Sequence, residues 1–153
     1  MSIDRAWGDV RAFHLAFGAP APDAPAELPR DRVMGRAAWI EEEAQELREA
    51  TTIDAQADAF IDVIYFALGG LVEMGIQPGP LWDIVQGANM AKLWPDGRPR
   101  FREGDGKVIK PAGWEDPAEK LAAEIHRQLD ASGLDERLRA AAPRAAMQPS
   151  VGR

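Results

Sequence analysis

The segment from residue 60 to residue 74 constrains this chain most, because it is apolar almost all the way round a helix. A helix with no polar face is typical of one buried on every side. Asp58 and Asp62 nevertheless lie one turn apart on a single narrow strip, which continues past Gly69 to Glu73. A buried carboxylate without a partner costs on the order of several kcal/mol. The strip is therefore expected to face cations, a metal ion or a water-filled cleft.

Helical patterns surround this segment, so the sequence predicts an all-α helical bundle with one Gly/Pro-rich basic loop. Ser, Thr, Gly and Pro at the expected ends delimit the helices. A proline-rich connector without helix is predicted over 19–29. Apolar periodicity predicts helices over 3–17, 31–50, 53–74, 78–93 and 117–132, with a short extra turn over 134–142. We expect one domain over 1–142 and a flexible tail over 143–153.

Composition narrows the functional classes. A net charge of −7 argues against general nucleic-acid binding, which needs positive charge. The chain has no cysteine, which excludes disulfides, thiolate metal sites and a cysteine nucleophile. The first residues lack the apolar core of a signal peptide, and the charge-free run 63–72 is half the length of a membrane span. We therefore expect a soluble, cytoplasmic protein with no nucleic-acid or membrane partner.

The helix predicted over 31–50 supplies acids that match those of the apolar segment. Glu42, Glu43 and Glu46 occupy an arc of about 100° beside its apolar stripe, and Glu43 lies nearest to that stripe. The break at Thr51–Thr52 is short, so the two helices are expected to be antiparallel neighbours. Their acids then converge with Asp58 and Asp62. A set of carboxylates without histidine or cysteine favours Mg²⁺ or Mn²⁺ over zinc or copper.

These residues resemble the motifs of the all-α nucleotide pyrophosphohydrolases, the MazG-like superfamily that includes dimeric dUTPases and phosphoribosyl-ATP pyrophosphohydrolases. The resemblance covers roughly residues 8–117. It rests on four segments, which are Glu42-Glu43-Ala44-Gln45-Glu46 (EExxE), Asp62-Val63-Ile64-Tyr65 followed by Gly69, Asn89-Met90-Ala91-Lys92, and Asp105-Gly106-Lys107-Val108-Ile109-Lys110.

The resemblance implies a bundle completed by dimerisation, as a homodimer or a dimer of dimers. It implies that Mg²⁺ is held by Glu43, Glu46 and Asp62, with Glu42 as a further ligand or as the base that activates water. Glu42 and Glu43 are therefore the candidate catalytic residues. The usual second motif is ExxD, but Ala59 stands three residues before Asp62. Asp58, four residues before it, is expected to substitute as a ligand, which leaves the number of ions open.

A basic loop over 94–114, with a short hairpin around 100–109, is the candidate phosphate site. Six cations stand against three acids between residues 92 and 110, which favours an anion site in an acidic chain. Candidate phosphate-binding residues are Asn89, Lys92, Arg102, Lys107 and Lys110. The loop begins and ends with a tryptophan, Trp94 and Trp114. Stacking on a nucleotide base and packing within the protein are both consistent with these positions.

The remaining conspicuous residues are interpreted as structural. His14 and His126 stand alone without ligand spacing, and catalysis by either is not expected. The other tryptophans, Trp7, Trp39 and Trp82, are expected in the core. Arg36 is left open, as a partner either for the acids or for a phosphate.

The predicted function is Mg²⁺-dependent hydrolysis of a nucleoside triphosphate to its monophosphate and pyrophosphate, in a house-cleaning or dUTPase-like role. One alternative is a phosphoribosyl-ATP pyrophosphohydrolase, and another is a non-catalytic helical dimer that binds nucleotide or metal. A ferritin-like di-metal oxidase is disfavoured, since it needs Glu-x-x-His pairs that this chain lacks.

Overall fold

The computed structural model describes residues 2–141, with side chains described as far as residue 133. The fold is all-α, since the described residues hold five helices and one two-stranded sheet. The elements are α1 (Ile3–Phe17), α2 (Arg30–Glu49), α3 (Ile53–Glu73), α4 (Pro78–Met90), β1 (Arg100–Phe101), β2 (Val108–Ile109) and α5 (Ala118–Ala141). The predicted tail over 143–153 lies outside the described residues.

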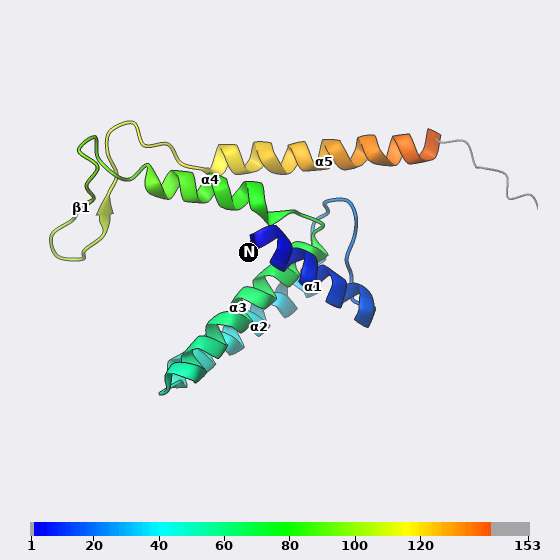
Figure 1. The fold of residues 1–153 in the computed structure, drawn as a ribbon, viewed down its shortest axis with the longest axis horizontal. Coiled ribbons are helices and arrows are strands. Elements are labelled where there is room, and N and C mark those ends of the chain that lie inside the picture. Colours follow the sequence, from blue (N-terminus) through cyan, green and yellow to red (C-terminus); the bar gives the residue numbers. More distant parts are fainter. Residues whose placement is uncertain (1, 142–153) are drawn as a thin grey trace, which may run out of the picture.

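Helices α2 and α3 form an antiparallel hairpin that projects from the rest of the molecule (Figure 1). The turn between them spans residues 50–52. The side chain of Thr52 caps α3 and accepts a hydrogen bond from the Ala55 amide at 3.3 Å, which fixes where α3 begins. Helix α1 packs across the other end of α3. The small buried core lies at that crossing and consists of Val10, Leu68 and Val72.

Helices α4 and α5 lie side by side and form a second layer above the α2–α3 hairpin (Figure 1). Gln128 of α5 binds the residue that precedes α4, because its side chain accepts from the Gln77 amide at 2.9 Å and donates to the Gln77 carbonyl at 3.1 Å. At the start of α4, the Gly79 amide donates to the carboxylate of Asp4 in α1 at 2.8 Å. These bonds join the two layers near the N-terminus of α4.

The predicted hairpin is confirmed, with Arg100 paired to Ile109 and Phe101 to Val108 in antiparallel register. Two boundaries differ from prediction by more than one residue. Helix α4 ends at Met90 rather than Leu93. The separate turn expected after Ser132 does not exist, since α5 continues through Gly133 to Ala141. One helical glycine costs only about 1 kcal/mol, which does not break an otherwise helical run.

The expectation that α3 is buried on every side is wrong for the single chain. Among the described elements, only α1 and α2 pack substantially against α3, which leaves its other face open. Phe60, Ile61 and Ile64 are more than half exposed there. Trp39 of α2 and Trp82 of α4, both predicted in the core, are also exposed, whereas Trp7 is half-buried against the core. By length and a mean hydropathy of 1.4, α3 could cross a membrane, a test that core helices of soluble proteins also pass.

Candidate functional site

Glu43 is the centre of a group of carboxylates on the α2–α3 hairpin, as the sequence predicts. Its side chain is half-buried in the seam, and its Oε2 atom is buried without a hydrogen-bond partner among the side chains and backbone that the structure describes. Burial raises the pKa of Glu43, and the nearby charges of Glu46, Asp62, Glu42 and Asp58 raise it further. We call these five residues the Glu43 cluster. The cluster concentrates negative charge around one carboxylate that has no partner.

The burial expected for Asp58 and Asp62 is wrong, although Glu73 at the end of the same strip is buried. Asp58 is exposed and Asp62 is half-buried, because the open face of α3 admits solvent to that strip. Among residues 2–133, no three acidic or histidine side chains stand close enough together to hold one metal ion. Glu46 and Asp58 are both exposed. The donor set, which is all oxygen, has the chemistry of a hard-cation site.

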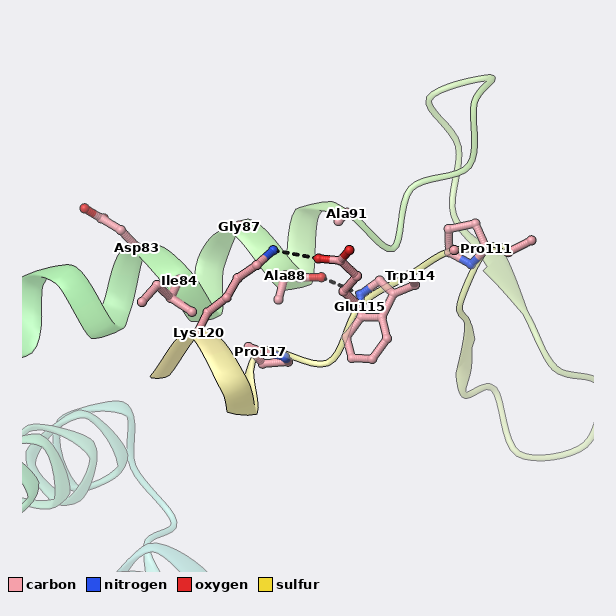
Figure 2. Close-up of a pocket in the computed structure, with 12 residues that line it drawn as sticks. Asp83, Ile84, Gly87, Ala88, Ala91, Pro111, Trp114, Glu115, Pro117 and Lys120 are labelled. Atoms are coloured by element: carbon pink, nitrogen blue, oxygen red, sulfur yellow. Dashed lines mark hydrogen bonds and ion pairs between the residues drawn. The ribbon is translucent and has the colours of Figure 1, made fainter. Parts of the chain in front are cut away.

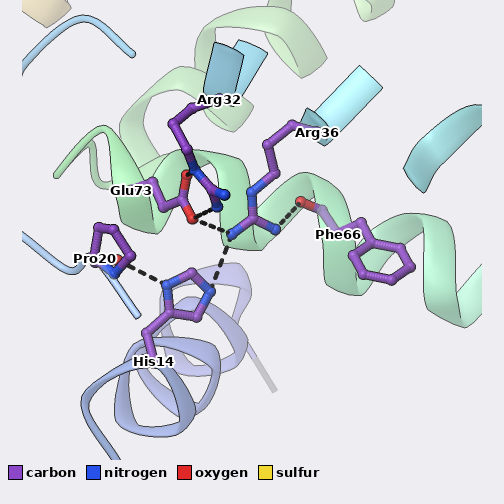
Figure 3. A network of polar contacts seen from close by, with 6 residues as sticks. All are labelled: His14, Pro20, Arg32, Arg36, Phe66 and Glu73. Carbon is purple, nitrogen blue, oxygen red and sulfur yellow. Dashed lines mark hydrogen bonds and ion pairs between the residues drawn. The ribbon is translucent and has the colours of Figure 1, made fainter. Parts of the chain in front are cut away.

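The strip on α3 ends at Glu73, where a buried ion-pair network replaces the open site (Figure 3). Arg32 and Arg36 of α2 both donate to the Glu73 carboxylate, Arg36 at 2.9 Å. Burial by itself raises the pKa of Glu73, but the hydrogen bonds and charges of the two arginines outweigh it and hold that pKa below its ordinary value. Arg36, left open by the sequence, is thus a structural partner of Glu73.

His14 completes this network from α1 (Figure 3). Its Nδ1 atom lies 2.8 Å from the Pro20 carbonyl, which can only accept, so Nδ1 carries the hydrogen. The Nε2 atom is then left to accept from Arg36 Nη2 at 3.2 Å. His14 is buried and has a structural role within the described residues, as its lone position in the sequence indicates.

The residues predicted to bind phosphate lie at the far end of α4 and in the loop beyond it. We call residues 89–114 the basic module. At its start, Lys92 Nζ donates to the Asn89 side chain at 2.7 Å, so these two residues share one face as predicted. Trp114 closes the module, since its indole donates to the Ala88 carbonyl at 2.8 Å and Lys110 stands 3.7 Å from the ring centroid. Trp114 therefore packs the loop onto α4.

The hairpin holds the other cations of the basic module. Arg102 donates to Asp105 at 2.9 Å through Nε, and Lys107 Nζ lies 3.8 Å from the same carboxylate. Trp94 donates to the Ile109 carbonyl at 3.2 Å, and the guanidinium of Arg100 lies 3.8 Å above its ring. Both flanking tryptophans thus make structural contacts, and each ring has at least one cation over it.

A pocket of about 400 Å³ lies between α4 and the segment that runs from the basic module into α5 (Figure 2). One wall consists of α4 residues such as Ile84 and Ala88, and the other contains Trp114 and Pro117. Lys120 reaches across to Glu115 at 2.8 Å at its rim. Sequence reasoning missed this pocket, because it depends on how the loop folds back over α4.

The structure brings the predicted residues together as two groups and not as one site. The Glu43 cluster lies on the α2–α3 hairpin, and the basic module lies on a separate arm beyond α4 (Figure 1). Within the described elements, no substantial packing joins α2 or α3 to either strand. In this same part of the chain, the Glu43 cluster forms no ion pair with any lysine or arginine.

Comparison with known proteins places this arrangement in context. Residues 10–89 match the family model of phosphoribosyl-ATP pyrophosphohydrolases, a range that includes the whole Glu43 cluster and ends at Asn89. The chain is also similar to a crystal structure from Exiguobacterium sp. 255-15 that is provisionally described as an NTP pyrophosphohydrolase, with 38% identity and a TM-score of 0.51. That likeness covers 83% of this chain and 97% of the other. None of the curated proteins matches the chain.

Proposed function

The chain belongs to the phosphoribosyl-ATP pyrophosphohydrolase family and is a pyrophosphohydrolase, and on this premise we propose that it hydrolyses nucleoside triphosphates to monophosphate and pyrophosphate with Mg²⁺. The observation that carries the proposal is the Glu43 cluster. A buried carboxylate oxygen of Glu43 has no hydrogen-bond partner among the described residues, and burial together with four other acids raises the pKa of the side chain. A divalent cation would relieve both features at once.

The residues fit a hard cation by their chemistry. Glu43, Glu46, Asp58 and Asp62 would hold Mg²⁺, with Mn²⁺ as a substitute, once the exposed side chains turn toward Glu43. Bound there, the ion would neutralise phosphoryl oxygens and favour ionisation of a bound water. Asp58 would fill the place left by Ala59, since it lies on the same face of α3 one turn before Asp62.

The chain's own residues would perform the remaining steps. Glu42 is exposed at the edge of the cluster, where it would accept a proton from the attacking water. Attack of the water forms one P–O bond and breaks the phosphoanhydride bond. The two products are the monophosphate and pyrophosphate. Carboxylates cannot bind phosphate oxygens, because both are negatively charged. These oxygens would be bound by Asn89, Lys92, Arg102, Lys107 and Lys110.

The test is incubation of the protein with each common and damaged nucleotide in Mg²⁺, with the products separated by chromatography. We expect a monophosphate and pyrophosphate, and no turnover in excess chelator. Release of orthophosphate with a diphosphate, or full turnover in chelator, would contradict the proposal.

Phosphoribosyl-ATP is the second candidate substrate, because the matching family model describes phosphoribosyl-ATP pyrophosphohydrolases. The same reaction chemistry applies to its triphosphate chain. Including it in the panel separates the two candidates, since the true substrate should have the higher kcat/KM. A dUTPase-like role predicts preference for dUTP in the same assay. The comparison also decides between these enzymes and a protein that only binds nucleotide.

A further inference from the structure

Resting on the proposed function for the class of ligand, we propose that the pocket beside α4 binds the base of a nucleotide whose phosphate lies on Lys92 and Lys110. This is the cavity of about 400 Å³ between α4 and residues 111–120, which we call the α4 pocket (Figure 2). It lies apart from the Glu43 cluster, because the main packing contacts of α4 run to α1 and α5.

The walls of the α4 pocket are held together by hydrogen bonds. The Trp114 indole donates to the Ala88 carbonyl at 2.8 Å and so joins one wall to the other. The Trp114 amide donates to the Pro111 carbonyl at 3.1 Å, which closes the turn in the second wall. The volume lies within the range of about 300–1,000 Å³ that is usual for small-molecule sites. The fold therefore forms a pocket that is large enough for a base and its sugar.

The inner surface of the α4 pocket suits a flat aromatic ring. Its α4 wall contains Ile84, Gly87 and Ala88, and the opposite wall contains Trp114 and Pro117. A Cβ atom added to Gly87 would meet nothing within 4 Å, so this glycine leaves free space in the wall. Apolar and aromatic walls with a few polar groups at the edge are typical of sites that bind nucleobases.

One end of the α4 pocket carries two lysines that no carboxylate neutralises. The Nζ atoms of Lys110 and Lys92 lie 3.7 Å and 5.8 Å from the centroid of the Trp114 ring. Across residues 2–133, neither lysine forms an ion pair. Lys92 donates instead to the neutral side chain of Asn89 at 2.7 Å. Two such ammonium groups in a chain with a net charge of −7 favour an anionic ligand.

The other end of the α4 pocket carries the carboxylate of Asp83. Asp83 is exposed and lines the pocket, and it makes no side-chain hydrogen bond or ion pair within the described part of the chain. Glu115, the other acid of the lining, is already paired with Lys120 at 2.8 Å. Asp83 lies about 10 Å along the helix axis before Met90, the last residue of α4, at roughly 1.5 Å per residue. The pocket thus has a hydrogen-bond acceptor at one end and cations at the other.

This polarity matches one class of nucleotide. The phosphate belongs beside the two lysines, so the base points toward Asp83, whose carboxylate accepts from a donor and repels a carbonyl oxygen. Adenine and cytosine present an exocyclic amino group where uracil presents a carbonyl oxygen. We therefore expect the α4 pocket to prefer nucleotides of adenine or cytosine to those of uracil.

Binding of nucleoside monophosphates in excess chelator tests this site without the metal that the proposed reaction needs. The reporter is the NMR signal of the Trp114 indole N–H in the ¹⁵N-labelled full chain, which has five tryptophans. Its loss in Trp114→Phe assigns it. AMP should shift this signal saturably and leave the signal of Trp39, one turn before Glu43, unchanged. The absence of a saturable shift with both AMP and CMP would overturn the proposal.

Gly87→Leu tests whether the nucleotide enters the α4 pocket. The new side chain extends into free space, and leucine favours helix over glycine, so the fold should be kept. We expect AMP to bind at least about tenfold more weakly, because the leucine occupies the volume of the base. Gln86→Leu is the matched control, since it adds the same side chain to α4 at an exposed position outside the pocket. Equal affinities of the two variants would overturn the proposal.

Two exposed substitutions test the ends of the α4 pocket and do not depend on the packing of α4. Lys110→Gln should reduce the ratio of AMP affinity to adenosine affinity by roughly tenfold, because it removes a charged donor to the phosphate. Asp83→Asn should abolish the preference for AMP over UMP, since an amide both donates and accepts. If either ratio stayed at its wild-type value, the proposed orientation of the nucleotide would be wrong.

Hydrolysis assays of the same variants identify the bound nucleotide and separate the two proposals. If Gly87→Leu raises the KM of the triphosphate as much as it weakens AMP binding, the pocket holds the base of the substrate. If only AMP binding is lost, the pocket holds a second nucleotide. A wild type that hydrolyses nucleotides without metal-free binding at Trp114 contradicts the pocket and leaves the proposed function intact. Binding at Trp114 without any hydrolysis contradicts the proposed function and leaves the pocket intact.

Discussion

Asp62 is the residue whose replacement distinguishes a metal site from a merely acidic surface. Asp62→Asn keeps the side chain's shape but removes one charge from the Glu43 cluster, so turnover should fall by roughly 100-fold or more. Without metal, stability should be unchanged or higher, because the substitution lowers repulsion around Glu43.

The measurement is a melting scan of wild type and variant with and without Mg²⁺. Asp62→Asn should lose most of the metal-dependent rise in Tm. Asp58→Asn should lose about as much if Asp58 replaces the glutamate that the second motif usually has in the place of Ala59. Glu41→Gln is the control, since Glu41 is exposed and does not act on Glu43. If the Tm of Asp62→Asn rose with Mg²⁺ as much as that of the wild type, these acids would be structural.

Glu73 should matter to stability and not to chemistry. Its carboxylate is almost fully buried and accepts from Arg32 and Arg36, so Glu73→Gln leaves buried positive charge without its partner. Loss of one partner of a buried pair costs about 3–5 kcal/mol. We therefore expect a Tm lower by roughly 10 °C, from about 2–4 °C per kcal/mol in a chain of this length. Thermal unfolding beside Glu41→Gln checks this, and equal Tm values would contradict it.

The ion pairs of Glu73 with Arg32 and Arg36 should also make the stability of the fold depend on pH in the acid range. The folded pKa of Glu73 lies below the ordinary value of 4.5. Its contribution is therefore fully present above about pH 4.5 and is lost as the pH falls through the lower folded value. Urea unfolding of wild type and Glu73→Gln between pH 7 and pH 3 should show a stability gap that is constant down to about pH 4.5 and narrows below it. A gap that stays constant to pH 3 would be inconsistent with this coupling.

At the scale of elements, the α2–α3 hairpin depends on the absence of a side chain at Gly69. A Cβ atom there would come within 2.5 Å of the Arg36 guanidinium. Arg36 could move only by leaving Glu73 and His14. The glycine therefore sets the spacing at which the two helices pack, and it acts through the ion-pair network.

Two adjacent alanine substitutions test this packing. Gly69→Ala should destabilise the fold by about 1–3 kcal/mol, as overpacking does. Gly70→Ala is the matched control, because a Cβ atom there meets nothing within 4 Å. It should gain up to about 1 kcal/mol from helix propensity. Chemical denaturation of both variants gives the comparison, and similar effects of the two would refute the role of Gly69.

At the scale of the whole molecule, the exposed face of α3 predicts association. Phe60, Ile61 and Ile64 form an apolar surface that a monomer would not keep in water. We expect sedimentation equilibrium to give at least twice 16.7 kDa across the micromolar range. Ile61→Asp should shift the protein toward monomer, whereas Glu119→Asp on α5 should not. A monomeric wild type over that range would exclude the dimer.

The sequence by itself determined the elements and their chemistry. Periodicity and end signals predicted the helices and the hairpin, since Thr52, Gly18 and Gly75 act on the backbone locally. Residue spacing also placed Glu43 in the seam between α2 and α3, because two helices joined by a short turn must pack antiparallel. These features depend on neighbours within a few turns of the chain.

Only the tertiary structure decided which faces of the helices are covered and which site residues lie together. Burial depends on what covers a face, so the sequence could not tell that α3 is open on one side and that Asp58 is exposed. The same apolar pattern serves a helix buried by its own chain or by another. Partners far apart in sequence, such as Arg36 with Glu73 and His14, follow from the crossing of α1 over α3. The separation of the Glu43 cluster from the basic module has the same cause, since the direction of α4 is set by packing between helices and not by local sequence.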